Sequence, residues 1–193
     1  MGTIDRQARN SAESRAREAD LLVAAARRGD REAFGQLVDR YRERIFALAL
    51  HIAGDVNEAD DITQDVFTRA FIKISTFEGR SSFFTWLYRI TLNRAFNARR
   101  NRKRRHTLKY NDDRVRMAVS VDAGGDPRLQ LELQETYTLL VMALDQLSRV
   151  LRATVVLTAL QGLSYREAAV VLDTSEATVD WRVHEARKQL RAA

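Results

Sequence analysis

The stretch Ser164–Leu190, SYREAAVVLDTSEATVDWRVHEARKQL, decides the fold of the C-terminal part of the chain. Ser164 is followed three residues later by Glu167, a capping box that predicts a helix over residues 165–172. Asp173-Thr174-Ser175 predicts a tight turn before a second helix, from Glu176 to about Leu190. Small or apolar residues stand where the two helices would pack closely: Ala168, Ala169, Leu172, Val179 and Val183. This spacing predicts a helix-turn-helix.

The second helix of such a unit enters the major groove of DNA, where its N-terminal turns contact base edges. The residues expected within reach of DNA are Glu176, Thr178, Asp180, Trp181, Arg182 and Glu185, with Arg187 and Lys188 further along and nearer the phosphates. An ordinary helical bundle has the same apolar spacing. The motif alone therefore leaves DNA binding and simple packing as two open interpretations.

Helical periodicity continues upstream of this motif. Leucines at spacings of three to seven predict one helix through Leu133–Leu147 and another through Leu151–Leu160. Residues 107–130 have no such period and contain Gly124-Gly125 and the only proline, Pro127, so they are predicted to be a linker. Before them, helices are predicted over about 19–28, from a cap at Asp30 to Gly54, from about residue 57, and over about 82–105.

The predicted fold is therefore all-α, with two small helical domains joined by a flexible linker. The first domain is expected over residues 19–106 and the second over 131–193, with residues 1–18 forming a tail. The 193 residues include one proline and eight glycines, too few for a turn-rich β-sandwich, and no cysteine, which excludes disulfides and thiolate metal sites. The apolar runs are far shorter than the ~20 residues of a membrane span, and the polar N-terminus is no signal peptide. A cytoplasmic protein without membrane insertion is expected.

The net charge of +6 is unevenly distributed. Gly79–Asn111 contains ten of the 32 basic residues and no acid, which leaves 22 bases against 26 acids, a net of −4, in the rest of the chain. The basic segment adjoins an aromatic cluster: Phe77, Phe83, Phe84, Trp86, Tyr88 and Phe96. Unpaired bases stack on aromatic rings while cations neutralise phosphates, so the segment indicates nucleic acid as the partner.

Three segments together resemble a known family. Asn57–Phe67 (NEADDITQDVF) resembles the helix by which bacterial sigma factors bind the RNA polymerase clamp. Phe77–Leu87 with Arg89–Asn93 resembles their promoter-melting segment, and Leu160–Ala169 with the following helix resembles their C-terminal helix-turn-helix. The matches stand in family order, and two domains without others are similar to the minimal extracytoplasmic-function (ECF) sigma factors of the sigma-70 family.

The resemblance implies a role for each segment. Asp60, Asp61, Gln64 and Asp65 would offer acceptors to the clamp of the largest polymerase subunit, and the C-terminal domain would contact the flap of the second-largest subunit. Residues Glu78, Gly79, Arg80, Ser81 and Ser82 would form the loop that receives an extruded base of the −10 element. Trp86 would support the melted edge or belong to the core. Upstream duplex would lie along Asn93, Asn97, Arg100 and Arg104. The second helix of the C-terminal motif would contact the −35 element.

The resemblance also implies no catalytic residue, cofactor or metal, and an anti-sigma factor as the regulating partner. Relatives commonly carry a basic residue where Asp180 stands and often another at Glu185, so a different −35 preference is expected here. Two alternatives remain: a free-standing helix-turn-helix regulator, and a nuclease with magnesium held by Glu58, Asp61 and Asp65. The three histidines (His51, His106 and His184) are widely spread and are interpreted as surface or capping residues.

Overall fold

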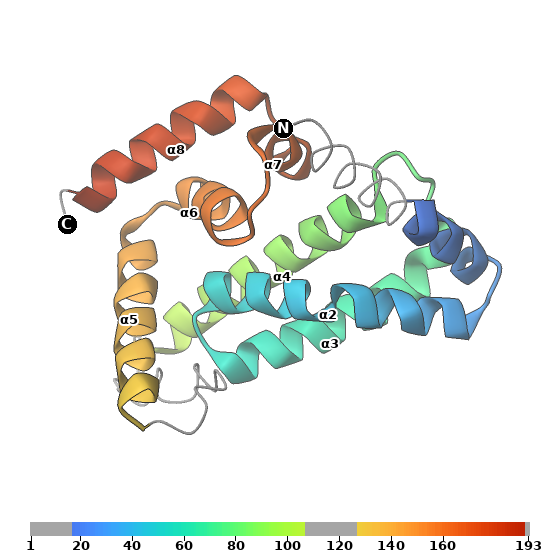
Figure 1. Cartoon of the computed structure of the whole chain (residues 1–193), viewed down its shortest axis with the longest axis horizontal. Helices are drawn as coiled ribbons and strands as arrows, with labels where there is room; N and C mark the ends of the chain where they lie inside the picture. Colours follow the sequence, from blue (N-terminus) through green and yellow to red (C-terminus); the bar gives the residue numbers. More distant parts are fainter. Residues whose placement is uncertain (1–16, 107–126, 192–193) are drawn as a thin grey trace, which may run out of the picture.

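The computed structural model describes residues 17–106 and 127–191, and every regular element in these two ranges is helical (Figure 1). The predicted all-α class is therefore confirmed. The expectations for residues 1–16 and 107–126 lie outside the described residues. Among the described helices, none combines the length and the hydropathy that a membrane crossing requires.

Residues 17–106 form the N-terminal unit. A helix over 17–27 is followed by α2 (Arg31–Ala53), α3 (Val56–Lys73), a short 3-10 turn (Ile74–Thr76) and α4 (Phe83–His106). The side chains of Asp30 and Asp55 cap α2 and α3 by accepting from the backbone N–H groups of Ala33 and Glu58. These caps satisfy backbone donors that a helix start leaves unpaired. Apolar residues at spacings of three, four and eight form one buried stripe of α2, at Leu37, Ile45, Leu48 and Ile52.

Residues 127–191 form the C-terminal unit: α5 (Pro127–Gln146), α6 (Arg149–Val155), a π-helical segment η2 (Val156–Leu160), α7 (Tyr165–Leu172) and α8 (Glu176–Arg191). Helix α5 begins inside the range predicted as linker, because proline suits the first position of a helix, where its missing N–H has no intrahelical partner. The π-helical segment was not predicted. It adds a wider turn after α6, in which the N–H of Gln161 donates to the carbonyl of Val156.

The predicted helix-turn-helix is confirmed in its local geometry. The Ser164 hydroxyl accepts from the N–H of Glu167 at 3.2 Å, and the Glu167 carboxylate accepts from the N–H of Ser164 at 2.8 Å, so the capping box is complete. Asp173 ends α7 in the left-handed region at φ +53°. Val179, Val183 and Ala168 are buried where α7 and α8 pack.

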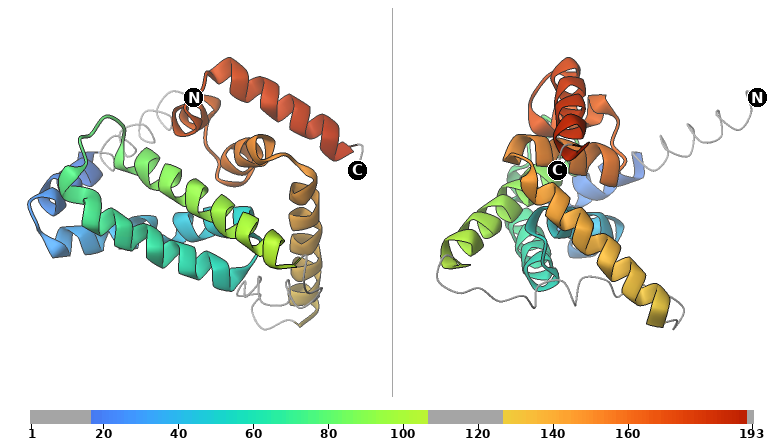
Figure 2. Two further views of the ribbon diagram at one scale, coloured as in Figure 1. Left: turned by 180° about the vertical axis from the view of Figure 1, so that it is seen from behind. Right: turned by 90° about the vertical axis from the view of Figure 1, so that its left-hand side faces the viewer.

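The two units are packed against each other. Helices α2, α3 and α4 lie side by side, α7 packs on α4, α8 packs on α6 and α7, and α5 runs across one end of the bundle (Figures 1 and 2). Hydrogen bonds join α4 to the C-terminal unit at Tyr88, Arg89 and Arg99. A single hydrophobic core runs through both units.

Candidate functional site

The acidic face of α3 divides into free and engaged side chains. Asp60, Asp61 and Gln64 are exposed, and neither aspartate forms an ion pair with another residue of the ranges 17–106 and 127–191. Asp65 is half-buried and accepts from Nε of Arg69 at 2.9 Å, and it also forms an ion pair with Arg94 of α4. The exposed acceptors available to a basic partner are therefore Asp60, Asp61 and Gln64, while Asp65 ties α3 to α4.

The same contacts decide against the magnesium alternative. The Glu58 carboxylate accepts from Arg102 at 2.8 Å, and Asp65 is held by two arginines. Over residues 17–106 and 127–191, no group of three His, Cys, Asp or Glu side chains is placed to hold a metal ion. Asp61 is left alone as a candidate ligand, so the Glu58–Asp61–Asp65 set is not assembled.

The loop between the 3-10 turn Ile74–Thr76 and α4 borders a pocket of about 270 Å³. Trp86 lines this pocket together with Phe77, Glu78, Gly79, Arg80 and Ser81 of the loop. The Trp86 ring is half-buried and packs 5.1 Å from the Phe77 ring and 5.7 Å from the Phe83 ring, centroid to centroid. Both interpretations of Trp86 therefore hold in part: one side packs on neighbouring rings and the other faces the pocket.

The side chains of Glu78, Arg80 and Ser82, in the loop Phe77–Ser82, have partners within the chain. Glu78 and Arg80 form an ion pair of 2.5 Å in which both side chains are exposed. Ser82 caps α4, since its hydroxyl accepts from the N–H of Thr85 at 3.1 Å. The positive φ of Gly79, +71°, gives the loop a turn that other residues adopt at a cost. The loop is thus held at both ends, and its middle lines the hollow.

Helix α4 presents two adjacent strips to the outside of the N-terminal unit. Asn97 is half-buried, and Asn93 and Arg100 are exposed, on the face predicted to lie along DNA. Helix α4 includes Arg104. The neighbouring strip is covered by the C-terminal unit, because Leu92, Phe96 and Arg99 are buried. Asn93 lies at the border of the two, where its Oδ1 accepts from Arg149 at 3.4 Å.

The predicted DNA-facing residues of α8 are mostly exposed. Trp181 is 62% exposed, and Glu176, Asp180, Arg187 and Lys188 are also exposed. Thr178, Arg182 and Glu185 are half-buried. The Thr178 hydroxyl lies 2.7 Å from that of Ser175, and the Glu185 carboxylate accepts a hydrogen bond from the Gln189 side chain. Arg187 and Lys188 line a hollow with His184 and Arg191, a cationic surface suited to phosphates.

Comparison with known proteins agrees with this geometry. The family model described as "Sigma-70 region 2" matches residues 37–105, and that described as "Sigma-70, region 4" matches residues 137–190. The chain is 31% identical over 176 residues to the ECF RNA polymerase sigma factor SigW of Bacillus subtilis, covering 88% of this chain and 92% of SigW. The chain belongs to the ECF sigma factors of the sigma-70 family. This family is not a class of enzymes.

Two solved structures extend the comparison. The ECF sigma factor described here superposes on CnrH in complex with the cytosolic domain of CnrY with a TM-score of 0.70 and 27% identity, covering 91% of this chain and 96% of CnrH. It matches RpoE in complex with the anti-sigma factor NepR, from Bartonella quintana, with a TM-score of 0.63 and 27% identity, covering 82% and 94%. The likeness spans both units.

Several residues at the contact between the units were not singled out from the sequence of this sigma factor. Arg152 of α6 is 1% exposed, and Asp145 of α5 forms ion pairs with both Arg152 and Arg99. His51 lies in the last turn of α2, as a capping residue would, yet its Nδ1 is buried and has no hydrogen-bond partner among the described residues. Burial and, second, the charge of Arg152 lower the pKa of His51. The sequence did contain one sign of this contact: Arg152 stands within the mostly apolar stretch 150–157, where a charged residue is expected to need a partner.

Proposed function

We propose that this ECF sigma factor binds core RNA polymerase and directs it to promoters with a −35 and a −10 element, helping to melt the DNA at the second. The observation that carries the proposal is the combination, on one N-terminal unit, of a free acidic helix face and a base-sized pocket beside a basic helix. A helix-turn-helix regulator that binds DNA without polymerase would need neither the acidic face nor the pocket.

Polymerase binding is assigned to the exposed acceptors of α3. Asp60, Asp61 and Gln64 point away from the bundle, and we propose that they meet a basic surface on the clamp of the largest subunit. Asp65 acts through its ion pair with Arg94, which joins α3 to α4, while its ion pair with Arg69 lies within α3. The C-terminal unit is proposed to contact the flap of the second-largest subunit.

Recognition of the −10 element is assigned to the pocket beside the loop Phe77–Ser82. Flipping a base out of the duplex costs unstacking energy. New stacking and hydrogen bonds to the base edge in a protein pocket offset that cost. The hollow of about 270 Å³ is lined by Trp86 and by Glu78, Arg80 and Ser81 of the loop. Upstream of it, Asn93, Asn97, Arg100 and Arg104 would follow the duplex.

Recognition of the −35 element is assigned to α8. Glu176, Thr178, Asp180, Trp181, Arg182 and Glu185 would face the groove, and Arg187 and Lys188 the phosphates. Acidic side chains repel phosphates but accept hydrogen bonds from cytosine N4. Exposed Asp180 therefore favours a cytosine in the −35 element.

Regulation is assigned to a protein partner in the cytoplasm. Because the sigma factor RpoE was solved in complex with the anti-sigma factor NepR, we propose that an anti-sigma factor covers the polymerase- and DNA-binding surfaces of this chain too. The chain itself is proposed to perform no chemical step and to need no cofactor or metal.

The deciding experiment is co-elution with bacterial core RNA polymerase in size-exclusion chromatography. The unmodified protein is compared with an Asp60→Arg, Asp61→Arg variant, in which both reversed charges lie on the exposed face of α3. The matched control is Asp39→Arg, Glu43→Arg, which makes the same charge change on the exposed face of α2. Asp65 is left intact because its reversal would break two ion pairs within the fold.

The expected result is stoichiometric co-elution of the unmodified and control proteins and its loss in the α3 variant. Run-off transcription from genomic fragments then identifies the promoters. A folded protein that does not co-elute, but binds duplex DNA tightly alone, would contradict the sigma-factor mechanism and favour the stand-alone regulator.

A further inference from the structure

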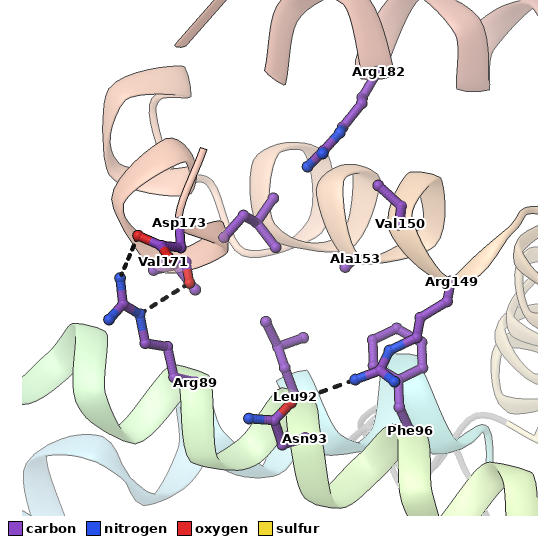
Figure 3. Close-up of a pocket in the computed structure, with 11 residues that line it drawn as sticks. Arg89, Leu92, Asn93, Phe96, Arg149, Val150, Ala153, Val171, Asp173 and Arg182 are labelled. Atoms are coloured by element: carbon purple, nitrogen blue, oxygen red, sulfur yellow. Dashed lines mark hydrogen bonds and ion pairs between the residues drawn. The ribbon is translucent and has the colours of Figure 1, made fainter. Parts of the chain in front are cut away.

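One pocket gathers arginines from three helices (Figure 3). Its volume of about 430 Å³ is within the range of small-molecule sites. Arg89 comes from α4, Arg149 from α6 and Arg182 from α8. Among the residues described as lining the pocket, Asp173 is the one acid, and its side chain is 95% exposed. The pocket therefore has an excess of positive charge, and we call it the three-arginine pocket.

The three arginines differ in how far contacts within the chain use their donors. Arg89 donates to two backbone carbonyls in the last turn of α7, at 2.6 and 3.1 Å. Arg149 makes one longer bond, of 3.4 Å, to Oδ1 of Asn93. Arg182 points into the pocket (Figure 3), and no hydrogen bond or ion pair engages it in the described part of the chain. Because a guanidinium has five N–H donors and no acceptor, Arg149 and Arg182 keep most of their donors for a ligand.

The rest of the lining suits a flat, partly apolar molecule. The guanidinium of Arg149 lies over the Phe96 ring, 4.7 Å from its centroid. Nucleic-acid bases stack on guanidinium planes as well as on aromatic rings, so Arg149 offers a stacking surface that the ring below it supports. The apolar residues of the lining are Leu92, Phe96, Val150, Ala153, Val171 and Leu172. A planar ring gains more from such a surface than a fully hydrated ion does.

A phosphate group suits the charge of this pocket better than a carboxylate. The guanidinium fork fits the oxygens of either anion. A phosphate ester, however, has three acceptor oxygens and a charge of about −1.5 to −2 at neutral pH, as phosphorylated side chains do. It can bind Arg182 and still be attracted by Arg89 and Arg149, whereas a carboxylate brings a single charge. The excess of cations in the lining therefore favours the more highly charged group.

We infer that the three-arginine pocket binds a nucleoside phosphate. Arg182 donates to the phosphate, and Arg89, held in place by α7, adds a second positive charge. Arg149 stacks on the base, and the Asn93 amide, which has both a donor and an acceptor, meets the base edge. The inference goes beyond the proposed function, because neither polymerase binding nor promoter recognition requires a small ligand.

The first test is isothermal titration calorimetry of the full chain in a phosphate-free buffer. The four probes are ADP, GDP, adenosine and inorganic phosphate. We expect one molecule of ADP or GDP to bind per chain. Adenosine lacks the charged group and inorganic phosphate lacks the ring, so each should bind at least about tenfold more weakly, the loss expected when a hydrogen bond to a charged group is removed.

Charge variants locate the bound nucleotide. Arg182→Gln removes the unengaged guanidinium and should weaken binding at least about tenfold. Arg166→Gln is the matched control, because it makes the same change at an exposed position of α7 outside the pocket lining. It should weaken binding by less than about twofold, since distant exposed charges are screened at physiological salt. Arg187→Gln tests the separate basic hollow of α8.

A second pair of variants fills space without changing charge. Val150→Trp places a large side chain in the pocket lining and should abolish binding. Val170→Trp makes the same change at a valine that does not line the pocket, and the two valines are similarly exposed, at 46% and 49%. Binding to Val170→Trp should equal binding to the unmodified protein. Circular dichroism verifies that the variants are folded.

Several results would overturn the inference. One is that neither ADP nor GDP binds at millimolar concentration, and another is that adenosine binds as tightly as ADP. A third is that folded Arg182→Gln and Val150→Trp bind nucleotide like the unmodified protein. Weakening by Arg166→Gln or Arg187→Gln as large as that by Arg182→Gln would mean general attraction to a basic surface. None of these measurements uses polymerase or DNA, so they leave the proposed function to its own test.

Discussion

The guanidinium of Arg152 donates a 2.8 Å hydrogen bond to the backbone carbonyl of His51, 101 residues earlier in the chain. The bond ties α6 of the C-terminal unit to the last turn of α2. Because α2 ends there, this carbonyl is one of the last four that have no partner inside the helix. The arginine thus satisfies a helix end of the other unit while its charge is balanced by Asp145.

Replacing Arg152 with methionine should lower stability. The apolar side chain fills a similar space, but the His51 carbonyl and the Asp145 carboxylate each lose a donor, at a cost of roughly 1–3 kcal/mol. The expected fall in melting temperature is about 2–4 °C per kcal/mol for a chain of this size, measured by circular dichroism. Arg149→Met, at an exposed position of the same helix, should change it by less. Equal melting temperatures for the two variants would contradict the buried role of Arg152.

Acid should weaken the contact between the units through His51. Burial and the charge of Arg152 lower the pKa of this histidine, so the folded form favours the neutral ring. Of the groups that face it, Arg152 stays charged, and burial raises the pKa of Tyr137 to about 12, so neither titrates in this range. Above the ordinary histidine pKa of about 6.5, the neutral ring costs no free energy of unfolding. As the pH drops below that value, the free energy of unfolding falls, because the unfolded chain takes up the proton more readily than the folded one.

The measurement is the melting temperature at pH 7.5 and pH 5.5. Unmodified protein should lose more stability between the two than His51→Gln, in which the titrating group is gone. His184→Gln, which removes an exposed histidine of α8, should behave like the unmodified protein. An identical pH response in all three proteins would show that His51 does not carry the effect.

Gly54 couples the end of α2 to α5. It has φ +76°, and a Cβ built on it would lie 3.1 Å from Cγ1 of Val141. Gly54→Ala should therefore cost roughly 1–2 kcal/mol for the left-handed backbone, and more for displacement of α5. In a double-mutant cycle with Val141→Ala, the second change should relieve only the steric part, giving a coupling of at least about 0.5 kcal/mol in urea unfolding. Strictly additive effects would mean that α5 does not press on Gly54 in solution.

Local features of this fold could be predicted from the sequence because they depend on near neighbours. The capping box of Ser164 and Glu167 and the cap at Asp30 connect residues three positions apart, and both are found as expected. The apolar stripe of α2 follows from spacing alone. The start of α5 at Pro127 differed, since proline and a glycine pair before it indicate a break without telling on which side the helix begins.

Contacts between distant residues could not be predicted, and the basic segment of α4 illustrates why. Its arginines have equal weight in the sequence and together indicate nucleic acid. In the structure Arg94 pairs with Asp65, Arg99 with Asp145 and Arg102 with Glu58. Arg100, one residue from Arg99, is exposed. The charges on one face of the helix thus stabilise the fold, and only the tertiary structure distinguishes this face from the one proposed to contact DNA.

The charge pattern of α8 leads to two opposite expectations for DNA binding. Asp180→Asn removes an exposed negative charge from the helix proposed to face the groove and should raise affinity for a random 30-base-pair duplex by up to about fivefold, since a unit charge pair at 4 Å in water is worth about 1 kcal/mol. Arg187→Ala should lower affinity and reduce the slope of log affinity against log salt by about one. Fluorescence anisotropy at several salt concentrations measures both, and Glu135→Gln on α5, which makes the same charge change as Asp180→Asn, is the control for that variant.

Because the two effects differ in sign, a general loss of folding cannot produce them together. Unchanged affinity in both variants would show that α8 does not contact the DNA.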